Sequence, residues 1–127
     1  MKKLLVIIVV SLCGILPSFA DSDVIITKKD LPTISQQFID KYFAGIEISY
    51  VKKEVEVLVI KSYDVILTNG VKLEFNNKGE WTSVDCKKSE VPSKIIPSAI
   101  LQYVKTNFPS NSIVEISKSV FGYDVDL

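Results

Sequence analysis

The sequence contains no histidine among its 127 residues. Histidine is the usual general base near neutral pH, the base in Ser-His and Cys-His nucleophile pairs, and the commonest metal ligand. Its absence argues against the common hydrolytic and metal-dependent mechanisms. We therefore expect no catalytic residue, no cofactor and no metal ligand, and we interpret the chain as a protein other than an enzyme.

One short motif resembles a catalytic one. Ser49 and Lys52 have the S-x-x-K spacing of penicillin-recognising enzymes. In those enzymes the motif lies on a helix and is accompanied by S-D-N and K-T-G elements. Here it falls in a strand pattern and neither companion is present, so we interpret it as coincidence.

Two other features are candidates for chemistry. Asp124 and Asp126 lie two residues apart on an expected strand, so both carboxylates face one side and could share a weakly held calcium ion. Calcium takes about six to eight oxygen ligands, and a solvated strand face is the favoured interpretation. Cys86 is a candidate reactive thiol, because Lys87 and Lys88 would lower its pKa; the favoured interpretation is a bystander at the end of a strand.

The N-terminus has the three parts of a secretory signal peptide: charged residues 1–3, an apolar run over residues 4–16, and a small-residue exit at residues 17–20. The run is too short for a hydrocarbon core that needs roughly 20 residues. The alternative is a lipoprotein signal ending at Cys13, against which Leu12 argues. We expect cleavage after Ala20 and a periplasmic or secreted protein.

Residues 21–127 are expected to form a single domain. Cys13 leaves with the signal, so no internal disulfide can form. Without Lys2 and Lys3 the charge is 13 − 15 = −2, with the signs interspersed along the chain. This balance excludes a nucleic-acid-binding footprint, and no membrane span is expected after signal removal. The sequence leaves the oligomeric state open.

The elements expected to carry these residues begin with a helix. Asp30 is positioned to cap it and Pro32 to lie in its first turn, and Ala44-Gly45 ends it. Its apolar face is expected to comprise Leu31, Ile34, Phe38, Ile39 and Tyr42. From Ile46 the apolar period becomes two, which indicates strands running through Val55, Val57 and Val59.

The segment over residues 62–85 predicts a strand register. A two-residue loop at Asn69-Gly70 would place the apolar residues of its two strands on opposite faces, whereas a three-residue loop ending at Gly70 places them on one face. A second three-residue loop, ending at Gly79, extends the face to Trp81. The expected core residues are Tyr63, Val65, Leu67, Val71, Leu73, Phe75 and Trp81.

The aromatic residues of that face, together with Tyr123, are interpreted as core rather than as a ligand-stacking platform. The other face of the predicted sheet is mixed in character, as expected of an antiparallel sheet open to water on one side. Because helices are expected to cover the core face, the open face is the candidate protein-binding surface. The face carries Asp64, and its candidate binding residues are Ile66, Lys72, Glu74, Thr82 and Val84.

The pattern then recurs. A first unit over about residues 30–86 is followed by a linker and by a partial second unit over about residues 95–127, at an offset of about 60 to 65 residues. Ile96-Pro97 matches Leu31-Pro32. We interpret this as a tandem repeat whose second copy is incomplete.

These residues resemble the PepSY-like, beta-lactamase-inhibitor-like family of small exported bacterial proteins. The matching features are Leu31-Pro32 with Phe38-Ile39, residues 63–70, residues 73–81, and Val91-Pro92 followed by Ile96-Pro97. The resemblance implies an α+β fold of tandem repeats, each with a helix on one face of an antiparallel sheet. It implies no common activity, so no binding residue is carried over.

The C-terminal segment is a candidate edge strand, because the second unit stops before the strands that would follow it. Its residues are Tyr123, Asp124, Val125, Asp126 and Leu127. A free strand edge is a template for another strand; the blander alternative is a truncated family member. We expect a binding or inhibitory module whose partner is another envelope or secreted protein. The alternative is a structural or assembly component that pairs through this edge.

Overall fold

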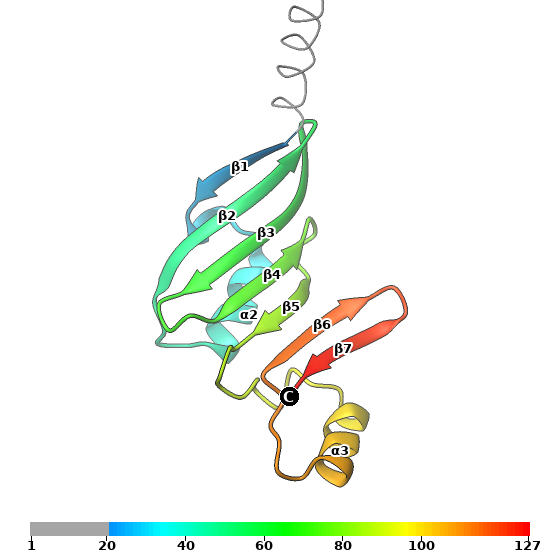
Figure 1. The fold of residues 1–127 in the computed structure, drawn as a ribbon. Helices are drawn as coiled ribbons and strands as arrows, with labels where there is room; N and C mark the ends of the chain where they lie inside the picture. The colour runs from blue at the N-terminus through cyan, green and yellow to red at the C-terminus, as the bar shows by residue number, and fades with distance from the viewer. Residues whose placement is uncertain (1–20) are drawn as a thin grey trace, which may run out of the picture.

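The computed structural model describes residues 21–127 and has one seven-stranded antiparallel sheet with helices packed on it (Figure 1). The elements are β1 (Asp21–Ile26), η2 (Lys28–Asp30), α2 (Thr33–Tyr42), β2 (Ile48–Glu56), β3 (Val59–Leu67), β4 (Lys72–Asn76), β5 (Trp81–Asp85), α3 (Ser98–Asn107), β6 (Glu115–Ser119) and β7 (Gly122–Asp126). Strands adjacent in sequence are adjacent in the sheet. The expected α+β class with an antiparallel sheet is confirmed, whereas the predicted signal peptide lies outside the described residues.

The helix α2 begins one residue after Pro32, which is its N-cap, so the prediction that Asp30 caps this helix is wrong. Leu31 precedes a proline and is therefore extended, with ψ 151°. This separates Asp30 from the helix. Its carboxylate instead accepts a hydrogen bond of 3.0 Å from the backbone N–H of Thr27. The last residue of α2 is Tyr42, and the C-cap residue Phe43 donates its N–H to the carbonyl of Ile39 at 2.9 Å.

The predicted register between β3 and β4 is confirmed, and so is the pairing of Phe75 with Trp81 at the start of β5. Val65 lies opposite Leu73 and Tyr63 opposite Phe75. Gly70 and Gly79 close the two loops with φ of 91° and 89°, values that glycine adopts without steric cost. All the predicted core residues are buried except Trp81, which is half-buried.

The alternation of β5 changes at a β-bulge. Phe75 lies opposite Trp81, but Glu74 lies opposite Ser83, so Thr82 is an extra residue on β5. The extra residue moves every later side chain to the other face. Val84 is consequently fully buried in the core, and its predicted place on the open face is wrong.

The strand predicted to continue through Val57 is interrupted by a hairpin turn. Glu56 pairs with Val59, and the turn residues Val57 and Leu58 have φ of 47° and 65°. Two-residue turns of this kind favour Asn-Gly. The apolar alternation continues through the turn, which is why the sequence pattern concealed it.

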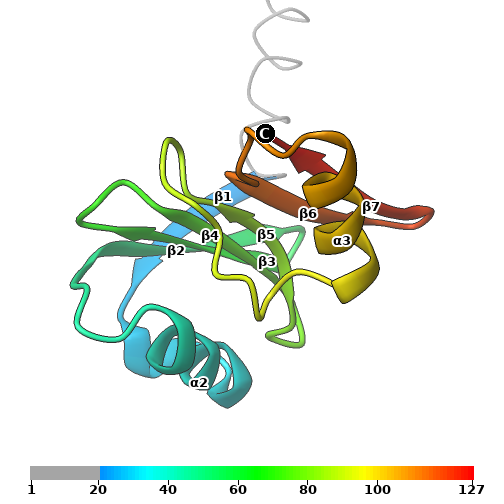
Figure 2. The same ribbon diagram turned by 90° about the horizontal axis from the view of Figure 1, so that it is seen from below.

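Both helices lie on the same face of the sheet, which is the core face. On α2, the ring of Phe38 lies 5.7 Å from that of Phe75 and 6.2 Å from that of Trp81. Val104 of α3 and Val125 of β7 line one groove. Figures 1 and 2 show α2 against the middle strands and α3 beside β6 and β7. Neither helix has the length and apolar character needed to cross a bilayer within residues 21–127.

The two α-helices have the same local geometry. Both have a proline N-cap, with φ −52° at Pro32 and −53° at Pro97, and both end at a phenylalanine. Their first residues are separated by 98 − 33 = 65 positions, and each is followed by a hairpin, β2–β3 or β6–β7. This geometry is compatible with the tandem repeat, which stays a prediction.

Candidate functional site

The open face of the sheet, away from the helices, is acidic. Cross-strand register places one row across it, namely Lys52, Asp64, Glu74, Ser83, Ser117 and Asp124. A second row comprises Ile66, Lys72, Asp85, Glu115 and Asp126. Asp23 and Glu54 pair beside these rows. We define the acidic face by its carboxylates: Asp23, Glu54, Asp64, Glu74, Asp85, Glu115, Asp124 and Asp126.

Lysines are few within these rows and are held by the carboxylates. Nζ of Lys52 lies 3.6 Å from the Asp64 carboxylate and 3.5 Å from that of Asp23. Burial opposes the charged form of Lys52, but Asp23 and Asp64 outweigh it and raise the pKa of the amine. Nζ of Lys72 lies 3.1 Å from Glu74, which raises the pKa of Lys72. Both lysines are therefore fixed as cations within an anionic surface.

Carboxylates also stand close together at two places on the face. Asp64 is 7% exposed, and burial, with Glu54 and Glu74 nearby, raises its pKa. Burial and the neighbouring Asp85 and Asp126 likewise raise the pKa of Glu115. Like charges on directly opposed residues destabilise a sheet. The arrangement is compatible with a cationic partner that would relieve this repulsion.

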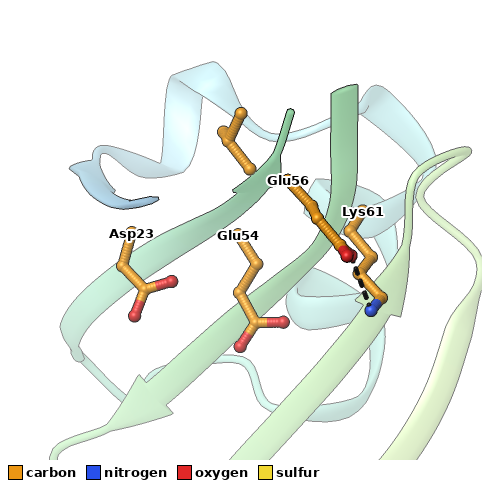
Figure 3. A pocket seen from close by; sticks show the side chains of 5 residues that line it. Asp23, Glu54, Glu56 and Lys61 are labelled. Atoms are coloured by element: carbon orange, nitrogen blue, oxygen red, sulfur yellow. Dashed lines mark hydrogen bonds and ion pairs between the residues drawn. The ribbon is translucent and has the colours of Figure 1, made fainter. Parts of the chain in front are cut away.

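A shallow pocket of about 270 Å³ lies at the β1 end of the face, lined by Asp23, Glu54, Val55, Glu56 and Lys61. Figure 3 shows the three carboxylates on the same side of β1 and β2. Lys61 lies 2.9 Å from Glu56, and the Ser62 hydroxyl donates to Glu54 at 2.8 Å. The pocket is thus a partly neutralised part of the acidic face.

Many of the other lysines lie away from the acidic face. Lys53 and Lys118 face the helix side of the sheet, because they pair with the core-face residues Tyr63 and Tyr123. Lys118 lies 3.9 Å from the ring centroid of Trp81. Helical lysines are Lys28, Lys29, Lys41 and Lys105. Charges interspersed in the sequence are therefore partly sorted by face in the fold, with Lys52, Lys72 and Lys87 paired to carboxylates of the acidic face.

An apolar groove of about 500 Å³ lies between α3 and β7. Its lining residues are Ala99, Ile100, Tyr103, Val104, Phe108, Tyr123, Val125 and Leu127. Tyr103 is 63% exposed, so the groove is open to solvent. The sequence analysis missed this groove because the groove depends on how α3 packs beside the last strand.

The structure brings together part of the predicted protein-binding face. Ile66, Lys72 and Glu74 lie on the open face and are half-buried. Thr82 is the bulge residue, and Val84 lies in the core. Most of the acidic face was missed, because a one-residue bulge and the pairing of β5 with β6 decide which side chains join it.

The remaining candidates have these positions. Ser49 and Lys52 lie on β2, as the coincidental interpretation requires. Cys86 is buried, and burial with Asp85 nearby raises its pKa to about 11. Lys87 does not activate the thiol, because its amine pairs with the Asp85 carboxylate at 2.9 Å. The reactive-thiol alternative is therefore wrong.

The predicted edge strand lies at an end of the sheet. β7 pairs with β6, and no described strand lies beyond it. Tyr123 is 44% exposed and its ring contacts that of Trp81, with centroids 6.5 Å apart. The core interpretation holds for Phe75 and Tyr63 but only in part for Tyr123, which also lines the groove.

Comparison with known proteins places this geometry in a family. No curated protein matches the chain. A protein of Bacteroides thetaiotaomicron described as a "putative calcium-regulated periplasmic protein" is 41% identical, with a TM-score of 0.77 over 82% of this chain and 81% of its own. A "putative periplasmic protein" of Bacteroides vulgatus is 41% identical, with a TM-score of 0.78 over 83% and 82%.

A further Bacteroides vulgatus protein, described as a "putative periplasmic protein of unknown function", is 39% identical, with a TM-score of 0.78 over 84% of this chain and 85% of its own. The family model described as "Putative beta-lactamase-inhibitor-like, PepSY-like" matches residues 61–127. That range includes β4, β5, α3 and the β6–β7 hairpin. The chain therefore belongs to the beta-lactamase-inhibitor-like, PepSY-like family.

Proposed function

We propose that this protein is an exported, non-enzymatic binding module that holds a basic partner protein against the acidic face of its sheet. The observation that carries the proposal is the one-sided sorting of charge, which gathers carboxylates on the surface that the helices leave open. Complementary charge steers a partner and selects against wrong ones. The relatives named as periplasmic support a partner that is itself an envelope or secreted protein.

Inhibition of an enzyme is one form that such binding would take. The family name supports it, but no residue of the acidic face identifies a target enzyme. A structural or assembly role is the second candidate, favoured by the open edge of β7. It differs in requiring backbone pairing rather than a charged face.

The name of one relative raises calcium as a ligand of the acidic face. Calcium takes about six to eight oxygen ligands. Within residues 21–127 no group of three or more acidic, histidine or cysteine side chains is placed to hold a metal. At the pocket near β1, Lys52 and Lys61 already neutralise Asp23 and Glu56. The residues present do not fit a calcium site, so we propose none.

The proposal is tested with residues 21–127 immobilised and exposed to an envelope extract at low salt. We expect basic proteins to be retained, and the double variant Glu54→Gln and Glu74→Gln to retain them several-fold less. The matched control is Glu47→Gln with Glu90→Gln, which changes the net charge equally at exposed positions off the acidic face. Equal loss in both variants, or retention that is unchanged at high salt, would contradict a role for this face.

A further inference from the structure

The outer edge of β7 is unpaired within the described chain. β7 closes the sheet order, with β6 as its neighbour on one side and no described strand on the other (Figure 1). A strand in this position presents backbone N–H and C=O groups that an added strand can pair. The edge alone does not identify the strand that pairs with it. The chemical character of the two sheet faces that border it indicates which side chains that strand carries.

One side of the edge borders the apolar groove. Val125 of β7 and Leu127, which follows that strand, line the groove on one side. Tyr103 of α3 and Phe108 at the end of that helix line it on the other. Leu127 is 41% exposed and Phe108 44% exposed. A strand added beside β7 would place every second side chain over this groove, because side chains alternate between faces.

The other side of the edge is anionic. Asp124 and Asp126 lie on the acidic face, and Glu115 and Asp85 continue the Asp126 row inward. Asp85 lies opposite Glu115 and Glu115 lies opposite Asp126, so three carboxylates lie side by side on neighbouring strands. The alternate side chains of an added strand would lie over this surface, where cations are favoured.

A second copy of the chain fits this edge poorly. Pairing β7 with β7 of another copy would put the Asp124 and Asp126 carboxylates of both chains on one face, beside Glu115 of each. Like charges on opposed strands destabilise the pairing. The charge pattern therefore disfavours a dimer through this edge and favours an occupant of opposite charge.

We propose that the β7 edge binds an extended segment of another protein in which apolar residues alternate with lysine or arginine. Its backbone pairs with β7, its apolar side chains enter the groove beside Tyr103, and its cations meet Asp124 and Asp126. Main-chain hydrogen bonds give such strand addition its affinity, and alternate side-chain sites give its specificity. This proposal rests on the proposed function, since it names the chemistry of the partner segment nearest β7.

The test uses a labelled eight-residue peptide of alternating valine and lysine, measured by fluorescence anisotropy with residues 21–127. The first control peptide has the same composition with the valines in one block and the lysines in another. The second has glutamate in place of lysine. Two further peptides carry backbone N-methyl groups on alternate residues, one on the valines and the other on the lysines, so that each removes a different set of N–H donors. We expect the alternating peptide to bind about tenfold or more tighter than the block and glutamate peptides, and one N-methylated peptide to lose binding.

Variants of the protein locate the site. Asp124→Asn with Asp126→Asn should weaken peptide binding about tenfold at low salt and flatten its salt dependence. Tyr103→Ser should weaken it about fivefold, whereas Leu58→Ser, at a residue 97% exposed far from β7, should leave it unchanged. Amide hydrogen exchange of residues 123–127 should slow only when the alternating peptide is present.

Each contrary outcome overturns the proposal. Equal binding of the block peptide, or equal binding of both N-methylated peptides, rules out strand addition. If sedimentation shows a dimer and added peptide reduces the dimer fraction, the β7 edge binds a second copy of the chain instead. Retention of basic envelope proteins by the acidic face while the peptide fails to bind would overturn this inference and leave the proposed function standing.

Discussion

Gly79 is the residue at which local backbone geometry and tertiary packing meet. Its φ is 89°, and a Cβ built there would lie 2.5 Å from Cβ of Pro32 and 2.9 Å from Oγ of Ser35. The Ser35 hydroxyl, fully buried, donates a hydrogen bond of 2.7 Å to the Gly79 carbonyl. The β4–β5 loop thus docks on the start of α2 at a site with no room for a side chain.

We expect Gly79→Ala to lower the free energy of unfolding by about 2 to 4 kcal/mol, because it adds a clash to the cost of a left-handed alanine. Gly70→Ala is the matched control. Its φ is 91°, but nothing lies within 4 Å of the added Cβ, so it should cost only about 1 kcal/mol. Urea unfolding of the two variants measures the difference. Equal losses would show that the contact with α2 carries no stability.

Cys86 gives a second prediction at the scale of single residues. The thiol is 4% exposed and its pKa is raised to about 11, so roughly one thiol in a thousand is ionised at pH 8. We expect reaction with a thiol-specific disulfide reagent at pH 8 to be slow in the folded protein and complete within seconds after unfolding in guanidinium. Fast reaction of the folded protein would contradict the burial.

At the scale of elements, the β2–β3 hairpin has a strained backbone at its solvent-exposed tip. Val57 and Leu58 have positive φ and are 69% and 97% exposed. The β6–β7 hairpin also has an apolar tip, at Val120 and Phe121, but neither of those residues has a positive φ. The two tips therefore respond differently to the same substitution.

Replacing Val57-Leu58 by Asn-Gly should raise the free energy of unfolding by about 1 to 2 kcal/mol, since both residues tolerate left-handed φ. The same replacement of Val120-Phe121 removes no left-handed strain and should give no gain. Chemical unfolding of both variants supplies the comparison. A gain at both tips would mean that lost apolar exposure, rather than backbone strain, is the cause.

The Asp85–Glu115–Asp126 row gives a pH-dependent prediction for three neighbouring strands. The pKa of Glu115 is raised above its ordinary value of 4.5. The folded state therefore binds its proton more tightly than the unfolded chain does, and stability is lost as the pH rises above that value. Glu115→Gln should stabilise the protein at pH 7, by about 0.5 kcal/mol, and not at pH 3. Thermal unfolding at both pH values decides. An equal gain at pH 3 would attribute the effect to packing.

The sequence specified most of these elements through local rules. Gly70 and Gly79 determined loop length, loop length determined register, and register predicted the buried set from Tyr63 to Phe75. The β5 bulge and the Val57-Leu58 turn escaped prediction for one reason: both depend on tertiary packing and have no glycine or asparagine to mark them. The position of Val84 was wrong as a result.

At the scale of the whole molecule, the candidate site is a product of the sheet rather than of any segment. Asp64 and Glu74 are distant from Asp124 in sequence, and the three become one row through four strand pairings. The composition has nearly equal numbers of positive and negative residues, so it does not reveal that the carboxylates gather on one face. A surface assembled by long-range register cannot be found by scanning for charged runs. For this reason the sequence predicted only Asp64 and Glu74 of the acidic face on the open side of the sheet.

The last prediction concerns the response of the whole molecule to calcium. A site with a dissociation constant near 1 mM would stabilise the folded protein by about 1.4 kcal/mol in 10 mM calcium. A domain of about 100 residues would then melt roughly 6 to 11 °C higher. Because no described acidic cluster fits the ion, we expect residues 21–127 to melt at the same temperature in 10 mM calcium and in EDTA at matched ionic strength.

Magnesium at the same concentration is the control for simple screening of the acidic face, since divalent cations of either kind reduce repulsion among its carboxylates. A small rise common to both ions is compatible with screening. A rise of several degrees with calcium alone would contradict the prediction, and its loss in Asp23→Asn or in Asp124→Asn would then locate the site at one end of the sheet or the other. In that case the acidic face would be a calcium-binding surface, and protein binding would be secondary.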